Sequence, residues 1–71
     1  MWEEYNEIGE NAGKIWRYLE EKRTEFTIQD LSKRMDMGIV EMTMAIGWLA
    51  REKNINIQRK GYLFYVSHLG Y

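Results

Sequence analysis

Apolar residues recur every three or four positions through the first third of the chain. Trp16 widens this stripe. Acidic residues occupy the first turns of the stretch, and Lys22 and Arg23 lie at its end. Such spacing is typical of an amphipathic helix, and this order of charges suits the helix dipole. We therefore predict a first helix whose buried stripe consists of Tyr5, Ile8, Ala12, Ile15 and Leu19.

Two shorter helices are predicted next, after a brief extended segment at Glu25–Thr27. Thr27 is placed to cap the second helix, with Asp30 in a variant of the capping box. This helix runs to about Met35 and ends in a turn over residues 36–38, where an aspartate tolerates left-handed geometry. The third helix, roughly residues 39–52, is expected to bury Met42, Ala45, Ile46 and Leu49.

The hydrophobic period changes from 3.6 to 2 after Lys53. Residues 54–59 alternate strictly, which places Ile55 and Ile57 on one face, and we expect that face to join the core. A turn at residues 59–61 and an aromatic, β-branched strand at residues 62–66 complete a predicted hairpin. Residues 68–71 are expected to fray.

This order of elements predicts an α+β fold that is mainly helical. Two short helices joined by a tight turn and followed by a hairpin are typical of a winged helix-turn-helix, in which the hairpin is the wing. An unrelated α+β domain of three helices and a hairpin is the alternative. No linker, proline or repeat interrupts the chain, so residues 1–71 are expected to form one domain.

Two segments resemble a known family. Residues 45–52 read Ala-Ile-Gly-Trp-Leu-Ala-Arg-Glu, and Gly9 and Gly13 lie in similar settings on the first helix, within Ile8-Gly9 and Ala12-Gly13-Lys14-Ile15-Trp16. Together they resemble a family of short, stand-alone winged helix-turn-helix proteins of prokaryotes, over roughly residues 5–66. The biochemical role of that family is unassigned, so the resemblance implies a fold and no catalytic residues.

Composition narrows the possibilities for function. The chain has 71 residues, a net charge of −1, 45% hydrophobic residues and no cysteine, which excludes disulfides and thiolate zinc sites. It has no apolar run long enough to cross a membrane, and its acidic start is unlike a targeting peptide. We expect a cytoplasmic protein that binds no membrane.

Positive and negative residues gather in different parts of the chain, so the positive part could form a phosphate-binding patch. If DNA is bound, we expect contacts to its backbone and weak specificity, because Thr43 is the one good base contact on the third helix and Glu41 would repel a phosphate. The alternative is that the lysines and arginines of this positive part simply form a solvated surface. The candidate nucleic-acid residues are Lys33, Arg34, Thr43, Arg51, Lys53, Arg59 and Lys60.

A protein interface is the competing interpretation. Residues on the third helix could form an exposed apolar patch, or Trp48 could fold back into the core. Two glycines on the first helix weaken it, which suggests close approach of another backbone, either within the fold or across a homodimer. The candidate interface residues are Gly9, Gly13, Ile39, Val40, Met44, Gly47 and Trp48.

Enzymatic chemistry has little support in the sequence. Glu3 and Glu7 are spaced for a shared face, but acids at the start of an exposed helix are typical of a solvated surface. His68 is the only histidine, and we expect it on the surface of the tail. The glycines match no phosphate-binding loop. We therefore predict no enzyme, no metal and no cofactor.

Overall fold

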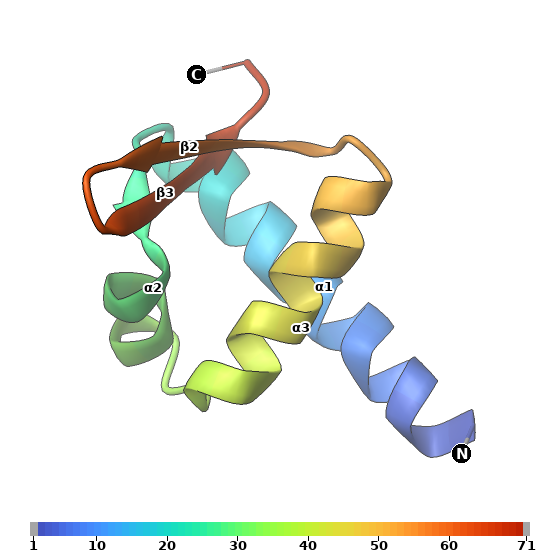
Figure 1. The fold of residues 1–71 in the computed structure, drawn as a ribbon. Coiled ribbons are helices and arrows are strands. Elements are labelled where there is room, and N and C mark those ends of the chain that lie inside the picture. The colour runs from blue at the N-terminus through green and yellow to red at the C-terminus, as the bar shows by residue number, and fades with distance from the viewer. Residues whose placement is uncertain (1, 71) are drawn as a thin grey trace.

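The computed structural model describes the backbone of residues 2–70 and the side chains of residues 3–70. The elements follow the order helix, strand, two helices and two strands (Figure 1). They are α1 (Trp2–Lys22), β1 (Phe26–Thr27), α2 (Ile28–Arg34), α3 (Ile39–Arg51), β2 (Ile55–Lys60) and β3 (Leu63–His68). The predicted helix-turn-helix with a hairpin wing is confirmed.

The core lies where α1, α2, α3 and the base of the sheet meet. Helices α1 and α3 cross, with α1 behind α3 in Figure 1, and the hairpin lies across one end of both. All four residues predicted for the core of α3 are buried. The core consists of Ala12, Ile15, Leu19, Phe26, Leu31, Met42, Ala45, Ile46, Leu49, Ile55 and Val66.

The first turns of α1 extend beyond this core. Tyr5 was predicted to be part of the buried stripe, but its side chain is 53% exposed. The reason is geometric, because α1 continues past α3 on the lower right of Figure 1, and Met44 is the residue of α3 that lines a hollow with Tyr5. The stripe becomes fully buried from Ala12 onward.

Local hydrogen bonds set where α2 and α3 begin and end. The Asp30 N–H donates to Thr27 Oγ1 at 3.0 Å, which confirms the predicted N-cap of α2. Asp36 has a φ of 50°, as the sequence suggested for this turn. Helix α3 ends in a Schellman motif, in which the Asn54 N–H donates to the Leu49 carbonyl at 3.0 Å and Lys53 has a φ of 57°.

The three strands form an antiparallel sheet in the order β1-β3-β2. Lys60 pairs with Leu63, so the hairpin turn consists of Gly61 and Tyr62 rather than the predicted residues 59–61. Gly61 has a φ of 65°, a conformation that glycine adopts without strain at the first position of such turns. β2 is therefore shifted by one residue from the expected range of 54–59 at the same length, whereas β3 extends beyond the expected end at Val66.

Two further predictions about the hairpin are wrong. Ile57 is 41% exposed, because the hairpin projects past the helices and only its base, at Ile55 and Val66, covers the core. The tail was expected to begin at His68, but β3 runs through His68 because that residue pairs with Ile55. The His68 side chain is half-buried, and its ring packs against Trp16 in a tilted arrangement with ring centroids 5.5 Å apart. Tyr71 lies outside the described residues.

Candidate functional site

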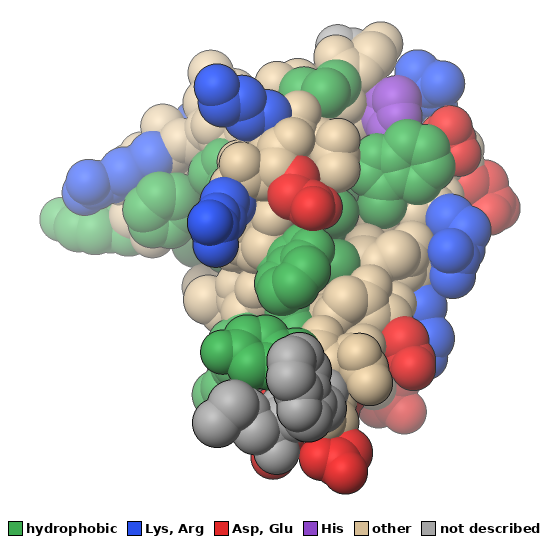
Figure 2. All heavy atoms as spheres, turned by 90° about the vertical axis from the view of Figure 1, so that its right-hand side faces the viewer, with side chains coloured by type: hydrophobic (Ala, Val, Ile, Leu, Met, Phe, Trp, Pro, Cys, Tyr) green, Lys and Arg blue, Asp and Glu red, His purple; other side chains and the backbone are tan. Residues whose placement is uncertain are grey.

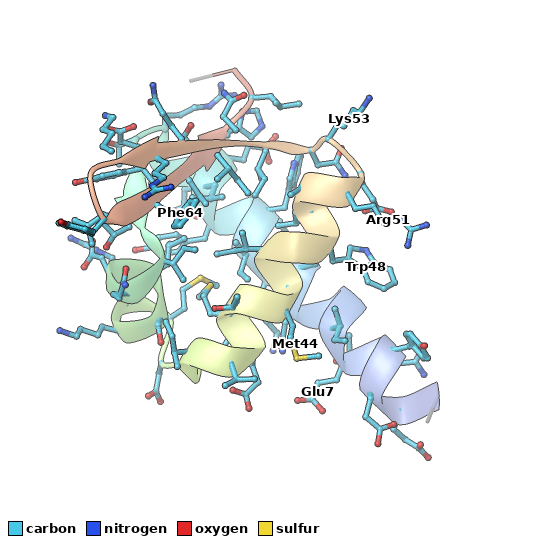
Figure 3. All side chains as sticks on the ribbon, viewed as in Figure 1. Glu7, Met44, Trp48, Arg51, Lys53 and Phe64 are labelled. Atoms are coloured by element: carbon cyan, nitrogen blue, oxygen red, sulfur yellow. The ribbon has the colours of Figure 1, made fainter. Side chains whose placement is uncertain are left out.

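The exposed part of α3 has two sides. The helical repeat of 3.6 residues places Val40, Thr43, Gly47 and Arg51 along one stripe, which we call the outer face. All four residues are exposed. Met44 and Trp48 lie on the other side, toward α1 (Figure 3), and Ile39 is exposed at the start of the helix. The residues predicted for the apolar patch of α3 are therefore all exposed, some on the outer face and some on the side next to it.

The outer face offers few groups that read bases. The Thr43 hydroxyl donates to the Ile39 carbonyl at 2.7 Å, which leaves its oxygen available as an acceptor. An added Cβ at Gly47 would meet nothing within 4 Å, so another molecule can approach the helix backbone there. The Glu41 carboxylate folds back over Gly38 at the start of α3, where the helix dipole favours its negative charge.

Two cations lie at the C-terminal end of α3. Figure 3 shows Arg51 and Lys53 pointing away from the body of the molecule. Both are exposed, and neither forms an ion pair with any residue from 3 to 70. The left-handed backbone at Lys53, which closes α3, fixes the direction in which this cation leaves the helix.

The structure separates the two cations of the wing. Alternation along β2 places Arg59 on the sheet face of Phe64 and Val66, which is the helix side, and Lys60 on the opposite face. Arg59 donates from Nε to the Gly61 carbonyl at 3.1 Å. Lys60 is engaged elsewhere, since its Nζ lies 2.6 Å from Glu25 Oε1 and 4.8 Å from the centroid of the Tyr65 ring.

The two cations of α2 also differ. Arg34 forms an ion pair with Asp30 at 2.9 Å, and its guanidinium lies 5.2 Å from the centroid of the Phe26 ring. The hydrogen bond that Arg34 donates to the Asp30 carboxylate, with a contribution from Tyr18, raises the pKa of Arg34 above its ordinary value. Lys33 is exposed and has no ion pair with a described residue. Arg34 is thus engaged by partners within the chain, whereas Lys33 is available to a ligand.

The tip of the wing also exposes aromatic side chains, which the sequence predicted only as part of an aromatic strand. Tyr62 is 95% exposed in the turn, and Leu63 and Phe64 are exposed beside it. In Figure 3 the Phe64 side chain lies on the helix side of the sheet. Alternation along the strand puts Tyr62 and Phe64 on the same face. Whether the helices cover this face depends on how far the hairpin projects, which the sequence does not show.

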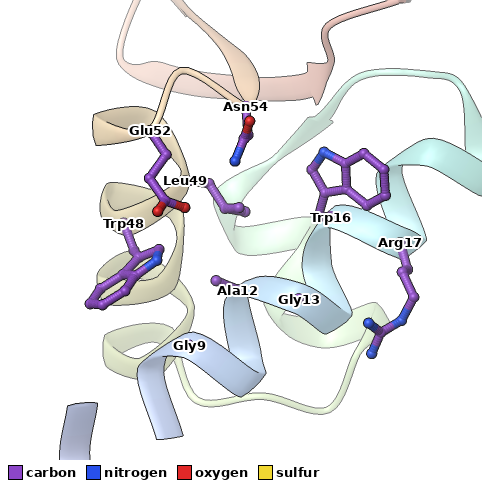
Figure 4. A pocket seen from close by; sticks show the side chains of 9 residues that line it. All are labelled: Gly9, Ala12, Gly13, Trp16, Arg17, Trp48, Leu49, Glu52 and Asn54. Atoms are coloured by element: carbon purple, nitrogen blue, oxygen red, sulfur yellow. The ribbon is translucent and has the colours of Figure 1, made fainter. Parts of the chain in front are cut away.

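A groove of about 430 Å³ lies between α1 and α3 (Figure 4). Trp48 stands on one wall and Trp16 on the other, with Gly9 and Gly13 on the α1 side. We call it the α1–α3 groove. It is lined by Gly9, Ala12, Gly13, Trp16, Arg17, Trp48, Leu49, Glu52 and Asn54.

The two glycines are not explained by packing within the chain. An added Cβ at Gly9 would meet nothing within 4 Å, and one at Gly13 would meet only Arg17 Nη1, at 3.5 Å. Close approach of another backbone within the fold is therefore wrong as an explanation. Trp48 is 38% exposed, so it has not folded into the core.

Apolar surface continues below this groove toward the start of α1. Met44 lines a second hollow of about 390 Å³ with Glu4, Tyr5 and Ile8. Figure 2 faces this side of the molecule and shows hydrophobic side chains on both sides of a hollow of backbone and small residues, with charged side chains around them. The surface between α1 and α3 is thus an apolar strip with a charged border.

No group of three or more metal-binding side chains occurs among the described residues. The helices in that part of the chain are too short or too polar to span a bilayer. The features that remain as candidate sites are therefore surfaces, namely the outer face of α3 with its flanking cations and the α1–α3 groove.

Two solved structures are similar to this chain in both fold and sequence. Protein BT2368 from Bacteroides thetaiotaomicron is 33% identical, with a TM-score of 0.82 over 94% of this chain and 80% of that chain. HOP2, described by its DNA recognition and protein interaction domains and its homologous DNA pairing, is 27% identical, with a TM-score of 0.73 over 82% of this chain and 97% of that chain.

Reduced HlyU from Vibrio cholerae N16961 shares the fold at 17% identity, with a TM-score of 0.71 over 82% of this chain and 59% of that chain. No curated protein sequence matches the chain significantly. The model of the winged helix-turn-helix domain family DUF2582 matches residues 1–68, and the chain therefore belongs to this family.

Proposed function

We propose that the protein is a small DNA-binding module that holds duplex DNA mainly by its phosphates, with weak sequence specificity and without catalysis. The observation behind this proposal is the outer face of α3, which no described part of the chain covers. In winged helices that bind DNA, this helix enters the major groove and the wing contacts the adjacent backbone. The HOP2 structure, with its DNA recognition domain, supports the same assignment.

Charge and side-chain chemistry define what kind of binding to expect. Lys33, Arg51 and Lys53 have no ion pair with a described residue, and Arg59 is bound only to a carbonyl. These four cations suit phosphate contacts, which dominate affinity in a salt-dependent way. Because Thr43 is the one residue of the outer face suited to base edges, discrimination between sequences should be small.

A titration of a random duplex against salt tests the proposal. If about four phosphates are neutralised, the logarithm of the binding constant should fall with that of the salt concentration with a slope of about −3 to −4. Fluorescence anisotropy between about 50 and 200 mM salt measures this slope. Absence of binding at the lower salt, or binding that ignores salt, would contradict the proposal.

The wing provides a matched pair of variants for the same titration. Arg59→Glu should abolish measurable binding at physiological salt, because Arg59 lies on the helix side of the sheet. Lys60→Glu makes the same change of charge one residue away, but Lys60 is held by Glu25 on the other face and should matter much less. Equal losses for the two variants would show that the wing contributes only its net charge.

A protein interaction module without nucleic acid is the second candidate. The α1–α3 groove favours it, because Trp48 and Met44 are exposed along one side of the molecule, with the half-buried Trp16 across the groove from Trp48. The titration distinguishes the two, since such a module would ignore DNA while still associating with protein. Both proposals keep the sequence-based predictions of a cytoplasmic location and no enzymatic activity.

A further inference from the structure

We propose that Tyr62, at the tip of the wing, stacks on an unpaired base, so that the protein prefers duplex DNA with a local interruption of base pairing to a continuous duplex. This inference rests on the proposed DNA-binding function and names the kind of DNA that the same surface selects. Three side chains at the end of the hairpin carry it, namely Tyr62, Phe64 and Arg59, and we call them the wing tip.

Tyr62 is the residue of the wing tip that the fold does not explain. Its side chain is 95% exposed, and none of the described residues forms a hydrogen bond or a ring contact with it. The φ of 65° at Gly61 satisfies the turn, and the position after such a glycine is typically Asn, Asp or Ser. The tyrosine therefore serves neither the turn nor the core, and its ring is open to another molecule.

Phe64 and Arg59 flank this ring. Phe64 is 46% exposed on the helix side of the sheet (Figure 3), and it pairs across the hairpin with Arg59, which lies on the same face. The bond from Arg59 Nε to the Gly61 carbonyl, at 3.1 Å, holds the guanidinium next to the turn. The wing tip thus places a fixed cation beside two exposed rings.

Charge selects nucleic acid as the partner of the wing tip. Residues 59–64 include two cations and no acid. Lys60 is neutralised by Glu25 on the other face, whereas Arg59 has no ion pair with a described residue. A cation beside exposed rings suits a polyanion whose bases have flat faces, because the phosphate attracts the cation and an unpaired base stacks on the ring.

The narrow shape of the wing tip favours a step between bases over a protein surface. Lys60 and Leu63 pair directly, so the hairpin ends in a turn of two residues. A specific protein interface uses about 20–30 residues on each side, many more than this turn presents. Side chains that enter between paired bases must first unstack them. Bases that are already unpaired remove most of this cost, which is why we expect a preference for interrupted duplex.

The first experiment compares two duplexes of the same length, one fully paired and one with three mismatched pairs at its centre. Fluorescence anisotropy with the full chain should show at least about fivefold tighter binding to the mismatched duplex. The two salt slopes should be similar, since the phosphates contacted are the same. Equal affinity overturns this inference and leaves the proposed function in place. Failure to bind either duplex at about 50 mM salt overturns both.

Variants at the turn test whether the ring of Tyr62 causes the preference. Tyr62→Ser should bring the ratio of the two affinities close to one, whereas Tyr62→Phe retains the ring and should retain the ratio. Leu63→Ser is the matched control, because Leu63 is the next residue, is also exposed and lies on the opposite face of the sheet. A ratio that survives Tyr62→Ser, or that falls equally in Leu63→Ser, overturns the stacking role. Circular dichroism checks that each variant is folded.

Photocrosslinking identifies the contact directly. With 5-iodouracil at the mismatched positions, mass spectrometry should find the crosslink on Tyr62, and crosslinks confined to α3 overturn the inference. An anionic lipid surface is the other partner that rings and cations suit. Cosedimentation with vesicles of anionic phospholipid that requires Tyr62, together with equal affinity for the two duplexes, would assign the wing tip to a membrane surface and overturn its role on DNA.

Discussion

The outer face of α3 and the side of α3 that faces α1 are built from one helix but differ in what they offer. The outer face has an exposed valine, a threonine, an open glycine and a cation near the end of the helix. The other side has Met44 and Trp48 above a groove whose border is charged. A helix of 13 residues thus supports a mixed surface, an apolar surface and a core.

This difference shows how so small a chain can have two binding surfaces. The helical repeat lets residues one or two positions apart belong to different surfaces. Thr43 lies on the outer face, Met44 on the side toward α1 and Met42 in the core. Substitutions can therefore affect one surface while leaving the other intact, or affect both through the core.

Met42→Ala should remove both surfaces at once and have the largest effect. Met42 is fully buried, and truncating such a side chain costs about 2–5 kcal/mol of unfolding free energy. We expect urea denaturation to show this loss, together with reduced DNA binding and reduced association with protein. Met44→Ala is the control on the same helix, and a similar loss of stability there would contradict the division into surfaces.

Trp48→Ala should affect only the side toward α1. An aromatic anchor at an interface contributes about 2 kcal/mol or more, so association with protein through this side should weaken at least about 30-fold. Duplex DNA binding per copy should change little. Sedimentation equilibrium and the anisotropy titration measure the two effects. If circular dichroism shows that the variant has unfolded, Trp48 belongs to the core and the comparison fails.

Gly47→Lys should strengthen the outer face. The substitution adds a cation where an added Cβ meets nothing, and it replaces glycine within a helix, which stabilises by about 0.5–1 kcal/mol. We expect tighter DNA binding with a salt slope steeper by about one. Gly47→Ala gives the stability without the charge. If the lysine binds DNA no better than the alanine, α3 does not approach the duplex.

Lys53→Gly should separate stability from binding at the end of α3. Lysine at a φ of 57° is strained relative to glycine, so the variant should gain about 0.5 kcal/mol in unfolding free energy. Loss of the cation should reduce the salt slope by about one. Calorimetry should then show a gain in stability and the titration a loss of DNA affinity. A variant that gains both stability and affinity would show that Lys53 does not contact phosphate.

Much of the fold follows from local sequence signals. The stripe of α3, the Thr27 cap and the turn at Asp36 depend on spacing and capping within a few residues, and the structure has all three. Ile57 could not be placed in this way. Its alternation with Ile55 is regular, but whether it is covered depends on how far the hairpin projects past the helices.

The candidate sites were harder to predict because they depend on contacts between distant residues. Lys60 and Arg59 are neighbours with the same charge, yet only Lys60 finds Glu25, which is 35 positions away. The groove shows the same limit. Two glycines on a helix indicate close approach, but only the crossing of α1 and α3 shows that this space is left open.

The position of β2 in the sheet has a consequence for the behaviour of the protein in concentrated solution. β2 has a partner on one side only, so its other edge presents free peptide groups that can pair with a strand of another molecule. Arg59 and Lys60 stand along this edge and oppose aggregation by repulsion. The charge reversals proposed above keep a charge at each position, whereas alanine at either position would remove the repulsion. The resulting aggregation would be mistaken for a loss of function.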